Sequence, residues 1–297
     1  MRIGITGASG MIGQGLSALA MSSGHEIIGY SRRSSAQVPL VTKSLVSSAT
    51  NVLPETKLDA LVHLAGENLF GLWTTKKRES IWHSRVDLTK QIVSQLKTWT
   101  AENRPRVLLC ASGIGFYGSR GDAILEENSS QGSGFLADLC RDWEAAAREA
   151  AKMGIRVVHL RTGVVLGENG GAFPKMRTAF KLGAGGRFGS GKQWMSWIHE
   201  QDQAALMLWA LENEAVVGPL NLCSPQPVTN ADFTRLLAAH LHRPAFMHVP
   251  AFALRLLMQG MADEMLLGSQ RAFPRVATDL GYKFAYPNLS DAFAVLS

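Results

Sequence analysis

Short apolar runs and segments of helical periodicity alternate along the first half of the chain. Residues 2–6 (RIGIT) and 25–30 (HEIIGY) have the apolar, β-branched character of buried strands, and residues 11–23 between them carry apolar side chains at helical spacing. The alternation continues with strands expected at 40–46, 59–65, 106–112 and 155–161 and helices at 76–101 and 135–152. Such repeats build parallel sheets with right-handed crossovers. The pattern predicts an α/β fold of the Rossmann type, with a doubly wound parallel sheet.

The pattern changes beyond residue 162. Glycine-rich loops surround a helix expected at 173–181, and a helix at 200–213 precedes a strand at 219–224. From residue 229 onward, prolines and glycines divide the chain into short helices. We therefore expect a first domain at 1–165, completed by a return segment at about 199–224, and a smaller, mostly helical substrate or lid domain at 166–297.

A glycine motif follows the first expected strand. The stretch GASGMIG places Gly7, Gly10 and Gly13 three residues apart, between a strand and a helix. Glycines in this context allow a sharp turn, a close approach of the backbone to a pyrophosphate and tight packing of the helix on the sheet. The free N–H groups of the helix N-terminus then face the anion. The motif predicts dinucleotide binding, with Ser9, Met11 and Ile12 also at the site.

The end of the second expected strand indicates which dinucleotide is bound. NAD sites place an Asp or Glu there to bind the ribose 2′-hydroxyl group. This chain instead has Ser31, Arg32 and Arg33, and an arginine side chain suits a 2′-phosphate. The expected cofactor is NADP(H). The alternative is a basic turn that is merely exposed to solvent.

Composition and charge exclude several other classes. Lys and Arg number 30 and Asp and Glu 24, a formal charge of +6, but the basic residues form no long tract, so no nucleic-acid binding is expected. No apolar run approaches the ~20 residues of a membrane span, and no signal peptide is recognised, so we expect a cytoplasmic protein. The spacing of the cysteines predicts free thiols, and that of the C-terminal histidines predicts no metal site (Cys110, Cys140, Cys223; His240, His242, His248).

Several motifs together resemble one family. They are TGASGMIG (6–13), SRR (31–33), LAGEN (64–68), HSR (83–85), SGIGFYG (112–118), RTGVVLG (161–167) and WIHEQD (197–202). The chain resembles the extended short-chain dehydrogenase/reductase superfamily, and within it a branch related to nucleotide-sugar epimerases. The resemblance implies an NADP(H)-binding first domain and a C-terminal domain for a small-molecule substrate, either a nucleotide sugar or a carbonyl compound, in a monomer or homodimer.

The resemblance also assigns cofactor contacts. Ser31 and Arg32 would meet the adenosine phosphate, and Arg85 would reach the cofactor from the long helix. Val165 would lie near the nicotinamide. Three residues after the fourth strand would pack along the cofactor (Leu64, Ala65, Gly66). Ordinary core packing is the alternative for Leu64, Ala65 and Val165.

The family's usual proton relay is missing. Its members pair a Tyr with a Lys four residues later, and those positions correspond here to Leu136 and Cys140. The helix at 135–152 carries an apolar stripe through both positions and is expected to be a packing element. Substitute catalytic candidates follow the fourth and fifth strands, where ligands bind in such folds (Glu67, Ser112, Tyr117). Two of them have a structural alternative: Tyr117 as a pocket wall, and Glu67 as an ion-pair partner of Arg85.

Two functions therefore remain open. The first is an NADP(H)-dependent oxidoreductase or nucleotide-sugar epimerase-like enzyme with a non-standard proton relay. The second is a catalytically inactive NADP(H)-binding sensor or interaction protein. An intact cofactor motif with a full second domain favours the first, and the missing Tyr and Lys favour the second.

Overall fold

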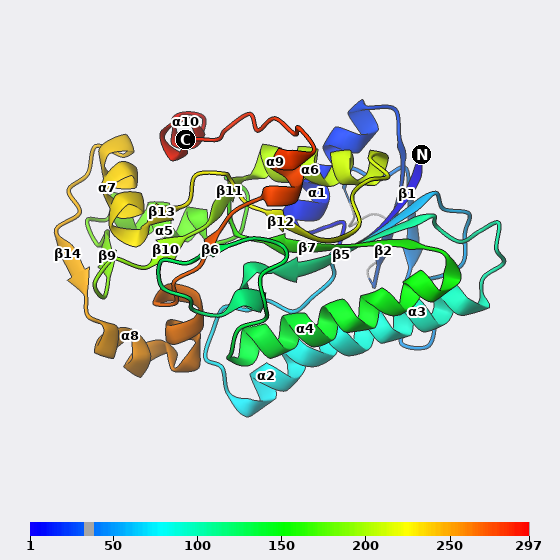
Figure 1. Cartoon of the computed structure of the whole chain (residues 1–297), viewed down its shortest axis with the longest axis horizontal. Helices are drawn as coiled ribbons and strands as arrows, with labels where there is room; N and C mark the ends of the chain where they lie inside the picture. Colours follow the sequence, from blue (N-terminus) through cyan, green and yellow to red (C-terminus); the bar gives the residue numbers. More distant parts are fainter. Residues whose placement is uncertain (33–38, 297) are drawn as a thin grey trace.

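A seven-stranded parallel sheet forms the centre of the molecule (Figure 1). This computed structural model describes residues 1–32 and 39–296. The strand order is β3-β2-β1-β4-β5-β7-β12, and every neighbouring pair is parallel. The order reverses beside β1, as in Rossmann folds, so the predicted fold class is confirmed. The strands are β1 (Arg2–Thr6), β2 (Glu26–Ser31), β3 (Lys43–Val46), β4 (Ala60–His63), β5 (Val107–Gly113), β7 (Arg156–Thr162) and β12 (Gly218–Leu222).

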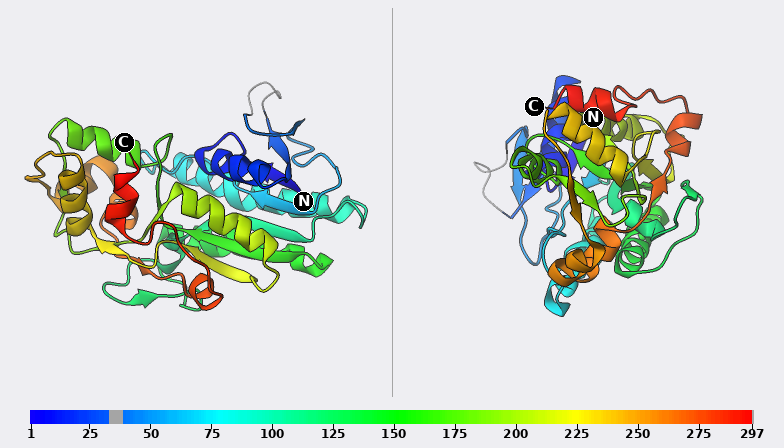
Figure 2. Two further views of the ribbon diagram at one scale, coloured as in Figure 1. Left: turned by 90° about the horizontal axis from the view of Figure 1, so that it is seen from above. Right: turned by 90° about the vertical axis from the view of Figure 1, so that its left-hand side faces the viewer.

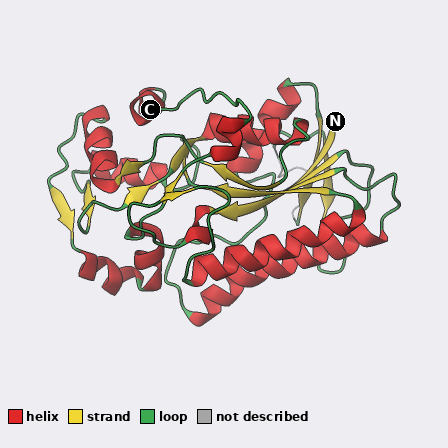
Figure 3. Ribbon diagram, in the orientation of Figure 1, coloured by secondary structure: helices red, strands yellow, loops and turns green. Residues whose placement is uncertain are grey.

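Helices cover both faces of the sheet (Figures 1 and 3). On one face α1 (Met11–Ser22) packs beside α6 (Glu200–Glu212), and on the other α3 (Leu88–Thr98) packs beside α4 (Phe135–Arg148). Each face has its own apolar cluster. Ile3, Ile5 and Leu16 belong to the first, and Leu61, Ile92 and Trp143 belong to the second. The central strands are therefore buried on both faces, which explains their unbroken apolar runs.

The long helix expected at 76–101 is interrupted by a π turn. It consists of α2 (Thr75–Trp82), a π-helical segment (His83–Asp87) and α3. The side chain of Thr74 caps its start by accepting a hydrogen bond from the Lys77 N–H group. π turns insert one extra residue into a helix and often occur at functional sites. The HSR motif lies within this turn.

Helix α4 is the packing element that its apolar stripe predicts. Leu139, Cys140 and Trp143 are buried, while Phe135 and Leu136 pack against the apolar cluster from its edge. A 3-10 segment (Glu149–Met153) continues the helix, so the expected span of 135–152 is close to the observed one.

The C-terminal part lies at the carboxyl end of the sheet, because β8 (Val164–Leu166) follows β7 almost directly. Figure 2 shows it at the end of the molecule away from the N-terminus. Phe173, Phe233 and Phe293 centre its own apolar cluster. Its helices are α5 (Phe173–Lys181), α7 (Asn230–His240), α8 (Ala251–Met258) and α10 (Leu289–Ala294), with a π segment (Ala262–Leu266). Helix α9 (Arg275–Asp279) instead packs against β12 of the central sheet. Its short strands are β9 (Gly186–Phe188), β10 (Trp194–Met195), β11 (Trp197–His199), β13 (Val228–Thr229), β14 (Met247–Val249) and β15 (Arg271–Ala272), the last paired with β6 (Ile124–Leu125). The proposed domain boundary near residue 165 stays a prediction.

Two further expectations can be compared with the structure. All three cysteines are buried free thiols, as predicted. Among the described residues, no helix has the length and apolar character required to cross a bilayer.

Candidate functional site

The glycine turn after β1 has the crowded geometry that its sequence predicts. Gly7 has a φ angle of +76°, and a Cβ atom on it would lie 2.9 Å from the Ala65 nitrogen. A Cβ atom on Gly13 would lie 2.4 Å from the Gly7 carbonyl oxygen. Gly10 caps α1 without a side-chain hydrogen bond. Because these three positions carry no side chain, a pyrophosphate can approach the backbone of the turn and the N–H groups at the start of α1.

This turn borders a cleft of about 850 Å³. Eight of the predicted cofactor residues line it (Gly7, Ser9, Gly10, Ser31, Arg32, Leu64, Ala65, Gly66). So do eight residues that were not predicted (Thr6, Tyr30, Ser47, Ser48, Ala49, Val52, Leu88, Ile92). Part of this second group could have been predicted from the serines that follow β3, because β3 ends at the same carboxyl edge of the sheet as β1 and β2.

Arg32 stands at the rim of the cleft, directly after β2, and its side chain is exposed. No Asp or Glu occurs among the residues that line the described cleft. An arginine at the rim of a cleft that no carboxylate lines suits a 2′-phosphate better than a ribose hydroxyl group. Arg33 lies outside the described residues.

Other predicted contacts lie beneath or beside the cleft instead of lining it. The Met11 side chain contacts the glycine loop after β8, at Gly170 and Gly171. Ile12 and Val165 pack against the apolar cluster of the same face. These residues position the start of α1 and the loop above it.

Arg85 projects from the π turn toward the same region. Its side chain is 9% exposed, and its guanidinium group lies against Gly66, where a Cβ atom would be 3.1 Å from Cζ. Cζ also lies 5.3 Å from the centre of the Trp143 ring. Burial lowers the pKa of Arg85 to about 10. Glu67 is not its ion-pair partner.

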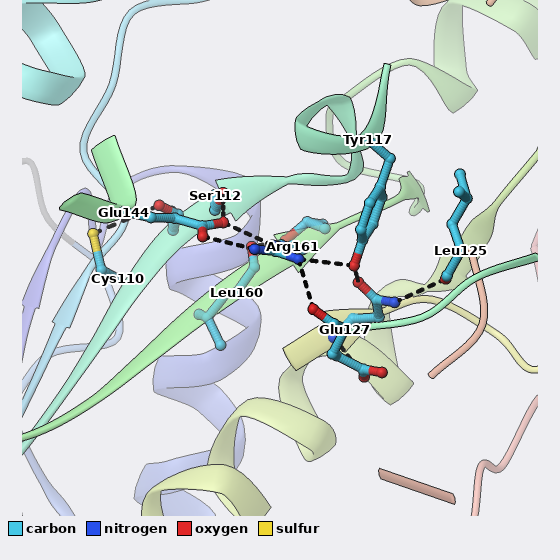
Figure 4. Close-up of polar contacts among 11 residues, drawn as sticks. Cys110, Ser112, Tyr117, Leu125, Glu127, Glu144, Leu160 and Arg161 are labelled. Carbon is cyan, nitrogen blue, oxygen red and sulfur yellow. Dashed lines mark hydrogen bonds and ion pairs between the residues drawn. The ribbon is translucent and has the colours of Figure 1, made fainter. Parts of the chain in front are cut away.

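Ser112 belongs to a buried polar network (Figure 4). Its hydroxyl group donates a 2.8 Å hydrogen bond to Oε1 of Glu144 on α4. Arg161 of β7 donates to both carboxylate oxygens of Glu144, at 2.8 and 2.9 Å. Glu144 and Arg161 are both almost fully buried. The carboxylate therefore accepts the hydrogen bond that the Ser112 hydroxyl group donates, and the serine oxygen keeps its lone pairs for accepting one.

Tyr117 lies at the far side of Arg161 (Figure 4) and is 0% exposed. Its hydroxyl group donates to Asn221 at 2.7 Å and accepts from Arg161 at 3.1 Å. Burial raises the pKa of Tyr117 to about 12. The phenol therefore holds its proton tightly and is enclosed by protein groups.

Glu67 is exposed and paired with a lysine. Its Oε1 accepts a 2.8 Å hydrogen bond from Lys77 of α2, and that bond lowers the pKa of Glu67. The carboxyl group is thus held in its ionised form. His199 caps α6 by accepting a hydrogen bond from the Gln201 N–H group.

Family models match most of the chain. The model described as the NAD dependent epimerase/dehydratase family matches residues 3–223. The chain belongs to this family. Residues 249–296 match a second model, a domain of unknown function (DUF1731). The extended short-chain dehydrogenase/reductase resemblance of the motifs is thereby confirmed.

Full-length relatives agree with this assignment. The chain is 35% identical over 293 residues to the epimerase family protein ML0860 of Mycobacterium leprae, covering 98% of this chain and 94% of that protein. A crystal structure of human epimerase family protein SDR39U1 with NADPH superposes with a TM-score of 0.88 at 32% identity, covering 99% and 98% of the two chains. A nucleoside-diphosphate sugar epimerase structure from Corynebacterium glutamicum has a TM-score of 0.80 at 35% identity, covering 99% of this chain and 57% of that one.

Proposed function

We propose that this chain binds NADP(H) in the cleft and acts as an NADP(H)-dependent oxidoreductase or nucleotide-sugar epimerase-like enzyme. The observation that carries the proposal is the combination of the glycine turn at Gly7–Gly13 with Arg32 at the rim of one cleft. The human relative crystallised with NADPH, at 32% identity over nearly the whole chain, supports the choice of cofactor.

Each part of the cleft suits one part of the dinucleotide. The N-terminus of α1 and Gly10 would hold the pyrophosphate, and Arg32 with Ser31 would hold the 2′-phosphate. Leu88 and Ile92 of α3, together with Val52, offer apolar surface to the adenine ring. When bound, the nicotinamide supplies hydride transfer.

Ser112 and Glu67 are the proposed groups for the substrate. The proton of Ser112 is directed to Glu144, so its oxygen would accept a hydrogen bond from a substrate hydroxyl group. Glu67, held ionised by Lys77, would act as an acceptor at the same edge of the sheet. Because its hydroxyl group is enclosed, we assign Tyr117 the role of positioning Arg161 instead of exchanging a proton with substrate.

One observation favours the second function, NADP(H) binding without catalysis. Leu136 and Cys140 occupy the positions of the usual Tyr and Lys, and both belong to the packed face of α4. Neither side chain can act there as the proton donor and cation of the standard relay. A chain of this kind would sense the cofactor or present it to a partner.

Calorimetric titration with NADPH and NADH tests the cofactor assignment. We expect NADPH to bind more tightly by ~1–3 kcal/mol, the scale of charge-assisted contacts to a phosphate. Arg32→Ala should remove that difference. Arg235→Ala serves as the control, because Arg235 is an exposed arginine of α7, paired with Asp232. Equal affinities for both nucleotides, or a preference that survives Arg32→Ala, would contradict the assignment.

Turnover assays separate the two functions. Purified protein with NADPH or NADP⁺ is offered nucleotide sugars and small carbonyl compounds. Oxidation, reduction or epimerisation that falls in Ser112→Ala and Glu67→Gln variants supports the enzyme. Tight NADPH binding with no turnover of any of these compounds supports the sensor.

A further inference from the structure

Large apolar side chains are exposed close together at the end of the C-terminal part. Five of them, between residues 246 and 257, are from 52% to 91% exposed (Phe246, Met247, Phe252, Leu256, Leu257). This segment contains β14 and α8, which lie at the end of the molecule away from the N-terminus (Figure 1). We call residues 246–257 the apolar tip. Single exposed apolar residues are common on protein surfaces, but a group of them marks an interaction surface.

Helix α8 is apolar on opposite sides. Leu254 is buried on its inner side. Phe252 and Leu256 are four residues apart, so they share the outer side, where 71% and 80% of their surfaces are exposed. A helix that is apolar all round is normally covered on every side. The outer side of α8 is therefore expected to meet another surface.

The segments that build this end of the molecule are basic. Residues 169–199 contain five Lys and Arg residues, residues 233–262 contain three, and neither segment contains an Asp or Glu. Arg187 of β9 lies opposite His248 of β14, and Arg243 precedes Phe246 by three residues. Both arginines are exposed. Arg255 of α8 pairs with Asp263, which follows the second segment. The apolar tip therefore carries positive charge beside its apolar side chains.

This charge decides between the possible partners. A two-fold interface with a second copy would bring identical basic surfaces together, which costs electrostatic energy. A nucleic acid would bind the cations but leave the phenylalanine and leucine side chains exposed to water. An anionic lipid surface satisfies both features, because its phosphates attract Lys and Arg while apolar side chains enter the headgroup region. The projecting side chains at the end of the molecule also suit a broad, flat surface.

We propose that the apolar tip docks on an anionic lipid surface, with Phe252 and Leu256 inserted among the headgroups and the neighbouring cations bound to lipid phosphates. Such peripheral binding requires no helix that crosses the bilayer. A short apolar segment alone binds a membrane weakly and reversibly, so the apolar side chains and the cations are both needed. The inference does not depend on NADP(H) binding.

The apolar tip is connected to the edge of the sheet at which the cofactor cleft lies. Beyond α8, the Glu264 carboxylate accepts hydrogen bonds of 3.0 and 2.7 Å from the N–H groups of Phe135 and Leu136, at the start of α4. Helix α4 begins on the side of the molecule at which the parallel strands end. Docking would therefore turn that side of the molecule toward the bilayer.

Sedimentation with lipid vesicles tests the proposal. The full chain should bind vesicles of phosphatidylcholine with about one third phosphatidylglycerol at least about tenfold more tightly than pure phosphatidylcholine vesicles. Phe252→Gln/Leu256→Gln should weaken binding to the anionic vesicles by at least about tenfold, and Arg243→Gln by about fivefold. Both changes are at exposed positions, so thermal unfolding should be unaltered.

A matched control uses exposed apolar residues elsewhere. Met21 lies near the end of α1 and Val217 directly before β12, so both are at the opposite edge of the sheet from the C-terminal part. Met21→Gln/Val217→Gln should leave vesicle binding unchanged. Arg106→Gln is the control for Arg243→Gln, because Arg106 is an exposed arginine directly before β5.

A second measurement detects insertion. All three native cysteines are buried. A polarity-sensitive fluorophore attached through Leu256→Cys should therefore report mainly on the apolar tip, and its emission should shift to the blue when anionic vesicles are added. The same fluorophore attached through Val217→Cys should show no shift.

Three results would overturn the proposal. The first is vesicle binding that Phe252→Gln/Leu256→Gln leaves unaltered, because charge alone would then account for it. The second is a dimer, seen by sedimentation velocity without vesicles, that the same double change dissociates, because the apolar tip would then bind a second copy. The third is binding to duplex DNA that Arg243→Gln weakens, together with no vesicle binding. None of these results bears on the cofactor cleft.

Discussion

The guanidinium group of Arg161 binds the carboxylate of Glu144 through two hydrogen bonds, of 2.8 and 2.9 Å, and both side chains are buried. The pair joins β7 to α4 beneath the loop that follows β5. Arg161 also stacks on the Phe116 ring at 3.6 Å and donates to the Glu127 carbonyl oxygen. One ion pair therefore fixes the segment that presents Ser112.

Removing one partner of this pair should be strongly destabilising. In Glu144→Gln, the Arg161 charge stays buried without a counter-charge, and the free energy of unfolding should fall by ~3–5 kcal/mol. Urea denaturation measures it. Glu149→Gln is the control, since Glu149 pairs with Lys152 on the surface and such pairs contribute about 0–1 kcal/mol. A similar small loss in both variants would show that the buried pair is not a determinant of stability.

Two glycines of helix α1 should respond in opposite directions to alanine. A Cβ atom on Gly13 would collide with the Gly7 carbonyl oxygen, so Gly13→Ala should cost ~1–3 kcal/mol and weaken NADPH binding. A Cβ atom on Gly15 would meet only Ala204, at 3.9 Å, so Gly15→Ala should stabilise the helix by roughly 0.5–1 kcal/mol. Thermal unfolding and NADPH titration measure both effects. Equal behaviour of the two variants would argue against the close packing at the turn.

Acid should destabilise the fold partly through His63. This ring is fully buried between the Thr6 and Thr89 hydroxyl groups, and burial lowers its pKa to about 3. Above pH 6.5 both the folded and the unfolded states are neutral at this site. As the pH falls toward 3, only the unfolded chain takes up the proton, so stability is lost with acidification.

The His63 contribution amounts to roughly 2 kcal/mol between pH 7.5 and 5. His63→Gln should remove that part of the pH dependence, which urea denaturation at the two pH values measures against wild type. The comparison cancels the contributions of other groups. A variant with the same pH dependence as wild type would show that folding does not lower the pKa of His63.

Restoring the family's usual pair should not restore its chemistry. In a Leu136→Tyr/Cys140→Lys variant, the new ammonium group would be buried beside the Arg85 cation, and the tyrosine would crowd Gly115, which already lies close to Leu136. We expect several kcal/mol of destabilisation and no sugar-nucleotide epimerisation. Denaturation and an epimerase assay check the two parts. Epimerisation gained by the variant would mean that only the two side chains were missing.

The fold was predictable because short apolar runs bounded by turn residues alternate with longer segments of helical periodicity. The weak strand was placed less well: β3 begins at Lys43 instead of residue 40, and Leu40 has a φ angle of +55°, which a strand does not allow. The π turn was not predicted, because the residue types of the HSR motif do not indicate an inserted residue. The π turn sets the direction of the Arg85 side chain, so that direction could not be predicted either.

The catalytic candidates were harder to predict, because contacts between distant segments decide them. Tyr117 follows a strand at the ligand-binding edge, yet Asn221, from a strand more than a hundred residues later, encloses its hydroxyl group. Glu67 pairs with Lys77. Several other cations lie nearby in the sequence, and spacing alone does not show which of them is the partner. Arg161 of β7 was an unused signal, since a buried charge requires a partner.

A crystal structure of the protein grown with NADPH tests the central claim most directly. The account predicts the pyrophosphate at Gly10 and the N-terminus of α1, the 2′-phosphate at Arg32, and the nicotinamide half within hydrogen-bonding reach of Arg85. A nucleotide bound with its 2′-phosphate away from Arg32, or outside the cleft that Gly7 and Gly66 border, would contradict it.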